Sequence, residues 1–397
     1  MVKGDFGNYK VYELYAIFLA ICMIPSMLIF VGEDFLSIAA RVGILCFLFI
    51  FYPYLRKDLN FVGILYCGAI TIGFVFHKMQ GLDVKLFGEV LVRIIPILVI
   101  LHYKYDRTYP NKIIKQFAIS FFVIECLLSI YEKFTLTHLI DYNSDTQAMN
   151  ETMYLDEEFR SFSLFGHPLH NANVVSVMLA FILCSNTIGK PFKAILFLLG
   201  MGAIWAFNSR ACLAIWLVLL FYRLFLYGKS LKWMLISMIL LLLVLPSIVL
   251  YVQKTGVLGR LDFDFTDSST LTRILAFQIF FSYPWSLNDL IFGGVELEQP
   301  TYAVAGTGVA DYVYIENGYL LDLGYWGIPL GIIKIVGELI ISYRALCHFS
   351  IKDKFIIMIA LWGVATMNNN TFWTFLMPFY LLSFLAFGIN NSKYKTR

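Results

Sequence analysis

Charge is what this sequence has least of. Asp, Glu, Lys and Arg make up 14% of the 397 residues, whereas 59% are hydrophobic. A soluble domain needs far more charge to cover its surface, and no polar block of the chain is long enough to be such a domain. The net charge of +3 is small and the basic residues are dispersed, so the composition excludes a nucleic-acid-binding protein.

Paired cysteines and metal-binding patterns are missing as well. The seven cysteines stand in apolar runs or beside a basic loop, and the sequence has no CxxC pair and no zinc spacing. We therefore interpret the cysteines as small buried hydrophobic residues. No small-residue cleavage site follows the first apolar run, which predicts a retained helix and not a signal peptide over residues 11–31.

Long apolar runs occupy most of the chain. A helix needs about 20 apolar residues to cross about 30 Å of hydrocarbon. The sequence therefore predicts an all-α integral membrane protein, a single polytopic domain (1–397) with about twelve transmembrane helices. The predicted spans are 11–31, 35–55, 61–77, 86–102, 113–131, 168–187, 191–207, 210–227, 231–252, 317–343, 354–369 and 371–389.

Basic residues distinguish the two sides of this predicted bundle. Starting with the N-terminal segment, every second connection carries at least two lysines or arginines, whereas the short turns at 32–34 and 368–370 carry none. By the positive-inside rule, both termini are cytoplasmic. Two outer loops, 132–167 and 253–316, are long. The apolar stretch 271–285 predicts a short helix on the outer membrane face within the larger loop.

Four arginines stand in the outer loops and turns, namely Arg160, Arg210, Arg260 and Arg273. Charge near lipid is costly, and a guanidinium binds phosphate oxygens through paired hydrogen bonds without losing its charge. Several arginines that converge would therefore suit an anionic ligand. For any one of them alone, pairing with a loop acid or capping of a helix end is the simpler explanation.

The residues around these arginines resemble motifs of a known family. Four stretches carry the resemblance: Arg160 with Phe165-Gly166-His167-Pro168 and Asn171, Asn208-Ser209-Arg210-Ala211, Arg260 with Asp267-Ser268-Ser269-Thr270-Leu271-Thr272-Arg273, and Glu316-Asn317-Gly318-Tyr319-Leu320. In this order they resemble the O-antigen polymerase and ligase superfamily, bacterial membrane glycosyltransferases that include Wzy-type polymerases. The resemblance covers residues 160–330, and the earlier residues match only as hydrophobic spans.

The resemblance implies a reaction. A Wzy-like polymerase transfers a glycan from an undecaprenyl-diphosphate carrier to a sugar hydroxyl on the outer face of the bacterial inner (plasma) membrane. It uses no metal, nucleotide sugar or other cofactor. Donor and acceptor are both undecaprenyl-diphosphate-linked glycans, and the product is O-antigen, capsule or exopolysaccharide. Membrane lipids and a chain-length regulator are the further partners that the resemblance suggests.

The resemblance and the chemistry together suggest a role for each matching residue. Arg210 and Arg273 would stabilise the charge on the leaving diphosphate, with Arg160 and Arg260 as further cations. Glu316 would be the base for the acceptor hydroxyl. The residues expected to contact substrate are His167, His170, Asn171, Asn317 and Tyr319. His167 and His170 are not expected to bind metal, because Pro168 separates them and no third ligand is evident.

Two alternatives stay open. Ligases of the family, which move glycan to lipid A core or to protein, have histidine where this chain has Glu316, and the carboxylate favours a polymerase. A flippase or transporter of lipid-linked oligosaccharide would also use intramembrane charges such as Lys334 with Glu338, or Glu125, for which the sequence names no partner. Such a protein should show repeat symmetry, and no similarity between 1–190 and 191–397 is evident.

Overall fold

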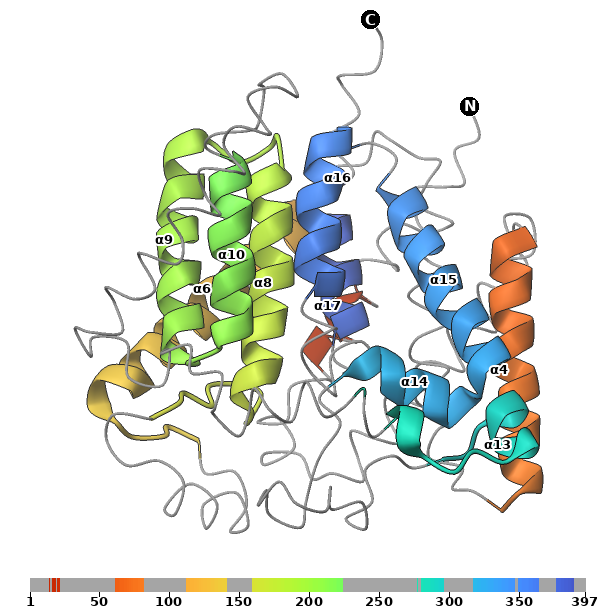
Figure 1. Ribbon diagram of the computed structural model, residues 1–397. Coiled ribbons are helices and arrows are strands. Elements are labelled where there is room, and N and C mark those ends of the chain that lie inside the picture. The colour runs from red at the N-terminus through yellow and green to blue at the C-terminus, as the bar shows by residue number, and fades with distance from the viewer. Residues whose placement is uncertain are drawn as a thin grey trace, which may run out of the picture.

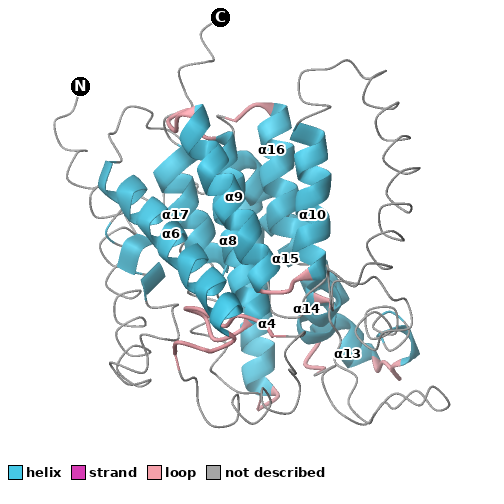
Figure 2. Ribbon diagram, turned by 90° about the vertical axis from the view of Figure 1, so that its left-hand side faces the viewer, coloured by secondary structure: helices cyan, strands magenta, loops and turns pink. Residues whose placement is uncertain are grey.

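Helices make up all the regular structure of the described part of the chain (Figure 1). The computed structural model describes residues 14, 16–18, 20–21, 61–81, 112–140, 159–223, 277, 280–295, 317–346, 349–363 and 376–388. These residues contain no strand (Figure 2), which confirms the all-α class. The predicted spans 35–55, 86–102 and 231–252 lie outside the described residues, as does most of 11–31.

The helix bounds agree with the predicted spans in most places. The helices are α4 (Phe61–Met79), α6 (Lys112–Thr135), α8 (Pro168–Cys184), α9 (Lys190–Ala206), α10 (Arg210–Phe221), α13 (Leu287–Phe292), α14 (Gly318–Trp326), α15 (Ile328–Ala345), α16 (Ile351–Met358) and α17 (Leu376–Ser383). α16 and α17 continue as π-helical turns, η4 (Ile359–Gly363) and η5 (Phe384–Gly388).

One helix in the described ranges, α6, has both the length and the composition to cross a membrane. Its 24 residues extend over about 36 Å at 1.5 Å per residue. The other apolar helices described are shorter. They include Pro168–Cys184, Cys212–Phe221 and Pro378–Gly388.

α8 is the centre of the first helix group. It packs against α6, α9, α10, α16 and α17, and 14 of its 17 residues are buried. A helix that is apolar on all sides is expected in such a central position. α9 approaches closely at Gly200, where a Cβ atom would lie 2.9 Å from Leu179 and 3.0 Å from Phe122. Figure 1 shows α8, α9 and α10 side by side.

The second helix group contains α4, α13, α14 and α15, and α4 runs along α15. Glycines again allow the close contact. A Cβ at Gly73 would lie 2.5 Å from the Trp326 ring, and one at Gly337 would lie 3.0 Å from Tyr66. Helices that associate in lipid use small residues in the same way.

The predicted span 317–343 is wrong as one helix, because the chain breaks at Gly327. Gly327 has φ +77, and a Cβ there would lie 2.5 Å from the Ile291 carbonyl oxygen. α14 and α15 therefore meet at a corner, and the large-loop helix α13 is docked against it. Gly294 N donates to the Tyr325 carbonyl at 2.8 Å. The hydrophobic pattern runs through this corner without interruption, so periodicity alone did not reveal it.

The large loop does contain short helices. Phe277, Phe280 and Phe281 are helical, within the predicted stretch 271–285. α13 follows after this stretch, and a capping box starts it: Ser286 Oγ accepts from Asp289 N at 3.1 Å, and Asp289 Oδ2 accepts from Ser286 N at 3.1 Å. This reciprocal pair satisfies two backbone donors of the first turn.

Candidate functional site

The segment before α8 is held against the end of α6, and Glu132 is the residue that holds it. Glu132 Oε2 accepts from Ser161 Oγ at 2.6 Å, Phe162 N at 2.8 Å and Ser163 N at 2.9 Å. Its other oxygen accepts from Leu139 N at 3.0 Å. The side chain is completely buried, and a buried carboxylate needs such donors. One acid therefore anchors both ends of the first long loop.

A second side chain, Asn171 in the first turn of α8, shapes the same segment. Its Oδ1 accepts from Phe165 N at 3.1 Å, and its Nδ2 donates to the Phe162 carbonyl at 2.5 Å. The segment is tightly turned, with φ +39 at Ser163 and φ +64 at Gly166. Asn171 is fully buried, so its place in the Gly-His-Pro motif has a structural explanation, and its contact with substrate stays a prediction.

Arg160 stands where this segment passes between α6 and α9. On one side Lys133 Nζ donates to the Phe159 carbonyl at 2.6 Å, and on the other Ser161 N donates to the Ala206 carbonyl at 3.1 Å. Arg160 itself is partly buried, and its positive charge acts on Lys133 and on His167. Two cations, Arg160 and Lys133, thus lie together at this end of the bundle.

The α9–α10 turn lies beside Arg160 and has almost no loop, as predicted. α9 ends at Ala206 and α10 begins at Arg210. Asn208 makes this possible by adopting φ +53, a conformation that Asn tolerates better than most residues. Its side chain is buried, and Oδ1 has no hydrogen-bond partner among the described residues. Buried acceptors are normally satisfied, so this oxygen is an exception among the described residues.

The two predicted histidines lie together at the start of α8. The ring centroids of His167 and His170 are 4.6 Å apart. His167 keeps an exposed face, but the atoms packed around its ring and then the positive charge of Arg160 lower its pKa below the usual value. His167 is therefore neutral at pH 7. In the described residues, no group of three or more His, Cys, Asp or Glu side chains could hold a metal.

The late motif occupies α14, which lies on the lower side of Figure 1, like the segment before α8. Asn317 is the N-cap of α14, and its Oδ1 accepts from Tyr319 N at 3.1 Å and Leu320 N at 3.2 Å. The Tyr319 hydroxyl donates to the Trp362 carbonyl at 3.1 Å, and the two rings stack. Both residues have structural roles, and their substrate contacts stay predictions.

The structure brings together some of the predicted site residues. Arg160, His167, His170 and Asn171 share one segment, and the backbone of Arg210 begins the neighbouring helix. The Arg210 side chain, Arg260, Arg273 and Glu316 lie outside the described part of the structure.

Sequence reasoning missed Glu132 and Lys133, and it quoted Asn208 only as part of a motif. Glu125 and Glu132 are seven residues apart on an apolar helix, which places both on one face, and this spacing was the available signal. Glu125 proves to have a loop partner: its Oε2 accepts from Leu164 N at 3.4 Å.

The chain matches no model of a known protein family and no curated protein. The resemblance to O-antigen polymerases therefore depends on the four motifs and on their order in the sequence.

A second buried polar cluster lies between α4, α14 and α15. Lys334 Nζ is 3.1 Å from Glu338 Oε1, which confirms the predicted pairing across one helical turn. Asp322 Oδ2 lies 2.9 Å from the same ammonium, and the Tyr66 hydroxyl donates to Glu338 Oε1 at 2.9 Å. Asp322 was not predicted to take part. All these side chains are buried, and the pairing lowers the cost of burying them.

Proposed function

We propose that this protein is a polytopic membrane glycosyltransferase that polymerises undecaprenyl-diphosphate-linked repeat units on the outer face of the bacterial plasma membrane. The observation that carries the proposal is the hydrogen bond between Ser161 N and the Ala206 carbonyl. It joins the segment of Arg160 to the turn that leads into Arg210. The segment of Arg160 and the start of the helix that begins with Arg210 therefore lie at the same end of the bundle. A site that binds a diphosphate through both arginines requires this arrangement.

Exposed apolar side chains support the membrane placement. Leu198 on α9 is 71% exposed, Ile195 is 60% exposed, and Phe61 on α4 is 73% exposed. Apolar faces of this kind are unfavourable in water and suit lipid chains. We infer that these helices belong to the bundle of about twelve spans that the sequence predicts.

The distribution of charge supports the orientation. The ends of α6, α8, α9, α10, α15 and α16 opposite to Arg160 form what we call the basic end. Among the described residues it carries one acid, Asp353, and eight basic residues: Lys112, Lys115, Lys190, Lys193, Arg223, Arg344, Lys352 and Lys354. Contacts join these segments, such as Lys115 Nζ to the Thr187 carbonyl at 2.9 Å. The positive-inside rule makes this end cytoplasmic and the Arg160 end external.

In the proposed reaction the leaving group is a lipid-linked diphosphate, and fixed positive charge lowers the energy of its departure. Arg160, Lys133 and the N-terminus of α10 at Arg210 would supply that charge, because a helix N-terminus attracts anions. Glu316, which directly precedes the N-cap of α14 in sequence, would take the proton of the acceptor hydroxyl.

The test is polymerisation by the purified chain in nanodiscs, given undecaprenyl-diphosphate-linked repeat unit without metal or nucleotide sugar. We expect a ladder of products on a sizing gel. Arg160→Ala, Arg210→Ala, Arg273→Ala and Glu316→Gln should each lower its yield at least about tenfold, as expected for groups that stabilise charge or move a proton. Arg344→Ala, at the basic end, is the matched control and should keep the ladder.

Two other outcomes would replace the proposal. Transfer only to a lipid A core or protein acceptor would identify a ligase. Movement of the intact substrate across liposomes, with no ladder, would identify a flippase.

A further inference from the structure

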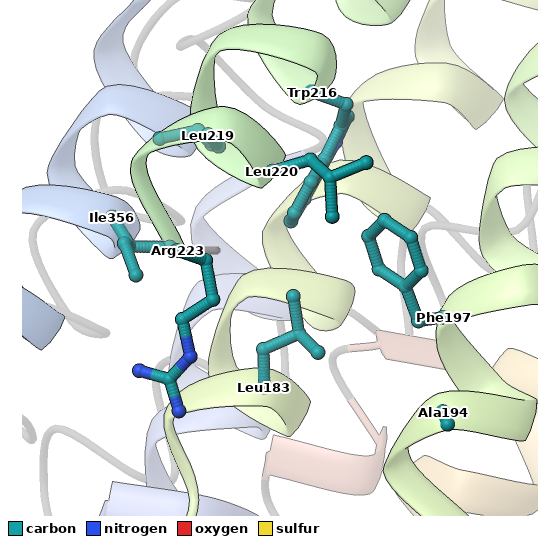
Figure 3. A pocket seen from close by; sticks show the side chains of 8 residues that line it. All are labelled: Leu183, Ala194, Phe197, Trp216, Leu219, Leu220, Arg223 and Ile356. Atoms are coloured by element: carbon teal, nitrogen blue, oxygen red, sulfur yellow. The ribbon is translucent and has the colours of Figure 1, made fainter. Parts of the chain in front are cut away.

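A small apolar cavity lies at the basic end of the bundle, and Figure 3 shows the side chains that line it. Leu183 of α8, Phe197 of α9, Trp216 and Leu219 of α10 and Ile356 of α16 form its walls, and Arg223 stands at one side. The volume is about 170 Å³, and almost all of the surface that lines it is apolar. The walls therefore suit hydrocarbon and not water.

The mouth of the cavity carries positive charge. Arg223 is partly exposed, and its Nη1 lies 3.3 Å from Asp353 Oδ1. Asp353 also accepts from Ser350 Oγ at 2.7 Å and Ser350 Oγ accepts from Asp353 N at 3.1 Å, so the acid is held independently of Arg223. Lys193 lies nearby, with its Nζ donating to the Leu183 carbonyl at 2.8 Å. Two cations face one acid, and the balance favours an anion.

A hydrocarbon-lined cavity with cations at its mouth is complementary to a lipid of negative headgroup. We propose that this cavity binds one acyl chain of an anionic phospholipid, with the lipid phosphate held by Arg223 and Lys193. The basic end as a whole, with eight basic residues and one acid, favours anionic lipid over neutral lipid of the same chain length. The inference depends on the membrane placement of the bundle and is independent of the polymerase reaction.

Two aromatic side chains line the cavity. Trp216 is fully buried, and its indole N–H has no hydrogen-bond partner among the described residues. Its face packs near Phe197, with ring centroids 6.2 Å apart. The two rings are in edge-to-face contact, and an acyl chain would lie against them and not between them.

The experiment is native mass spectrometry of the full-length protein in detergent, titrated with phosphatidylglycerol or with phosphatidylcholine of identical acyl chains. We expect one phosphatidylglycerol molecule to bind tightly and phosphatidylcholine to bind more weakly. Arg223→Gln should lower the phosphatidylglycerol affinity about fivefold and leave phosphatidylcholine unchanged, because one basic residue near a membrane surface contributes about that factor. Arg344→Gln, an exposed arginine of the same end outside the cavity, should change neither.

A second pair of variants tests the cavity itself. Ala194 lines the cavity from an exposed position of α9, so Ala194→Trp fills it without disturbing the core and should abolish the tight binding of phosphatidylglycerol. Ile195→Trp, at the adjacent exposed position, is the matched control and should retain it. Equal affinities for the two lipids, or tight binding that survives Ala194→Trp, would overturn the proposal. Neither result would bear on the glycan ladder, which is measured separately.

Discussion

The two buried polar clusters of this protein both contain buried carboxylates, but the groups that these carboxylates bind are different. Glu132 accepts from N–H and hydroxyl donors of the segments around it, whereas Asp322 of α14 and Glu338 of α15 each pair through one oxygen with the ammonium of Lys334 on α15. A carboxylate that recruits backbone donors determines the course of a loop. An ion pair between helices determines only how the helices pack. The first cluster therefore shapes the candidate site, and the second stabilises the half of the molecule that contains α14.

Removing the cation of the second cluster should have the largest effect on stability. Lys334→Met leaves two buried carboxylates without their counter-charge, which costs about 3–5 kcal/mol. We expect a large fall in the thermal unfolding midpoint in detergent. Lys334→Arg keeps the charge and should cost much less. If the methionine variant were as stable as the arginine variant, the ion pairs would not support this half of the fold.

Removing the acid of the first cluster should act on the loop as well as on stability. Glu132→Ala leaves four hydrogen-bond donors without their acceptor. We expect the free energy of unfolding to fall by about 2–3 kcal/mol, a loss limited because some of these donors can form hydrogen bonds with water instead. Hydrogen exchange should show faster exchange at the amides of Phe162 and Ser163. Unchanged protection of these two amides would contradict the role that we assign to Glu132.

The neighbouring acid is the matched comparison on the same helix. Glu125 lies on the same face of α6 as Glu132, yet the hydrogen bond that its side chain accepts from Leu164 N is long, at 3.4 Å. Glu125→Gln should therefore cost no more than about 1 kcal/mol and leave the exchange of Phe162 and Ser163 unchanged. An effect as large as that of Glu132→Ala would remove the contrast between the two acids.

The α9–α10 turn beside the first cluster makes a smaller prediction. Asn208 has φ +53, which costs a residue such as alanine about 1–2 kcal/mol. Asn208→Ala should lower the stability by about that amount, whereas Asn208→Gly should retain it. Thermal unfolding measures the difference between the two variants. Glycine adopts a positive φ more readily than alanine does, so equal stabilities would show that the turn does not require this conformation.

The smallest expected effect concerns pH. The pKa of His167 is lowered in the folded protein, so the unfolded chain binds the proton more strongly. The contribution of the neutral His167 ring to the stability of the fold is complete above the unfolded pKa of about 6.5, and it is lost as the pH falls below that value. His167→Asn should flatten this acid side of the stability curve, measured as the unfolding midpoint from pH 7.5 to 5. If the variant keeps the same dependence of the unfolding midpoint on pH, another titrating group causes the loss of stability at low pH.

Much of the fold was predictable because lipid-length apolar runs and turn residues are local signals. The bounds of α8 and α9 fall within three residues of the predicted spans, and the Asn208-Ser209 turn was predicted from the near absence of a loop. The corner at Gly327 has a local signal, because Pro329 follows the glycine in the first turn of α15, but the uninterrupted apolar run concealed it. The contact with α13, a segment more than 30 residues earlier in the chain, could not be predicted from any local pattern.

For the candidate site, the sequence by itself determined which residue types are present and in what order: four arginines, two histidines and an acid in outer segments. It also determined the helical character of the chain, because helix formation and apolar length are properties of consecutive residues. The tertiary structure alone decided that Glu132 binds the segment of Arg160 and that the Ala206 carbonyl accepts a hydrogen bond from Ser161 N. Such contacts join residues 29 to 45 positions apart, and their energy exists only once α6, α8 and α9 have packed together.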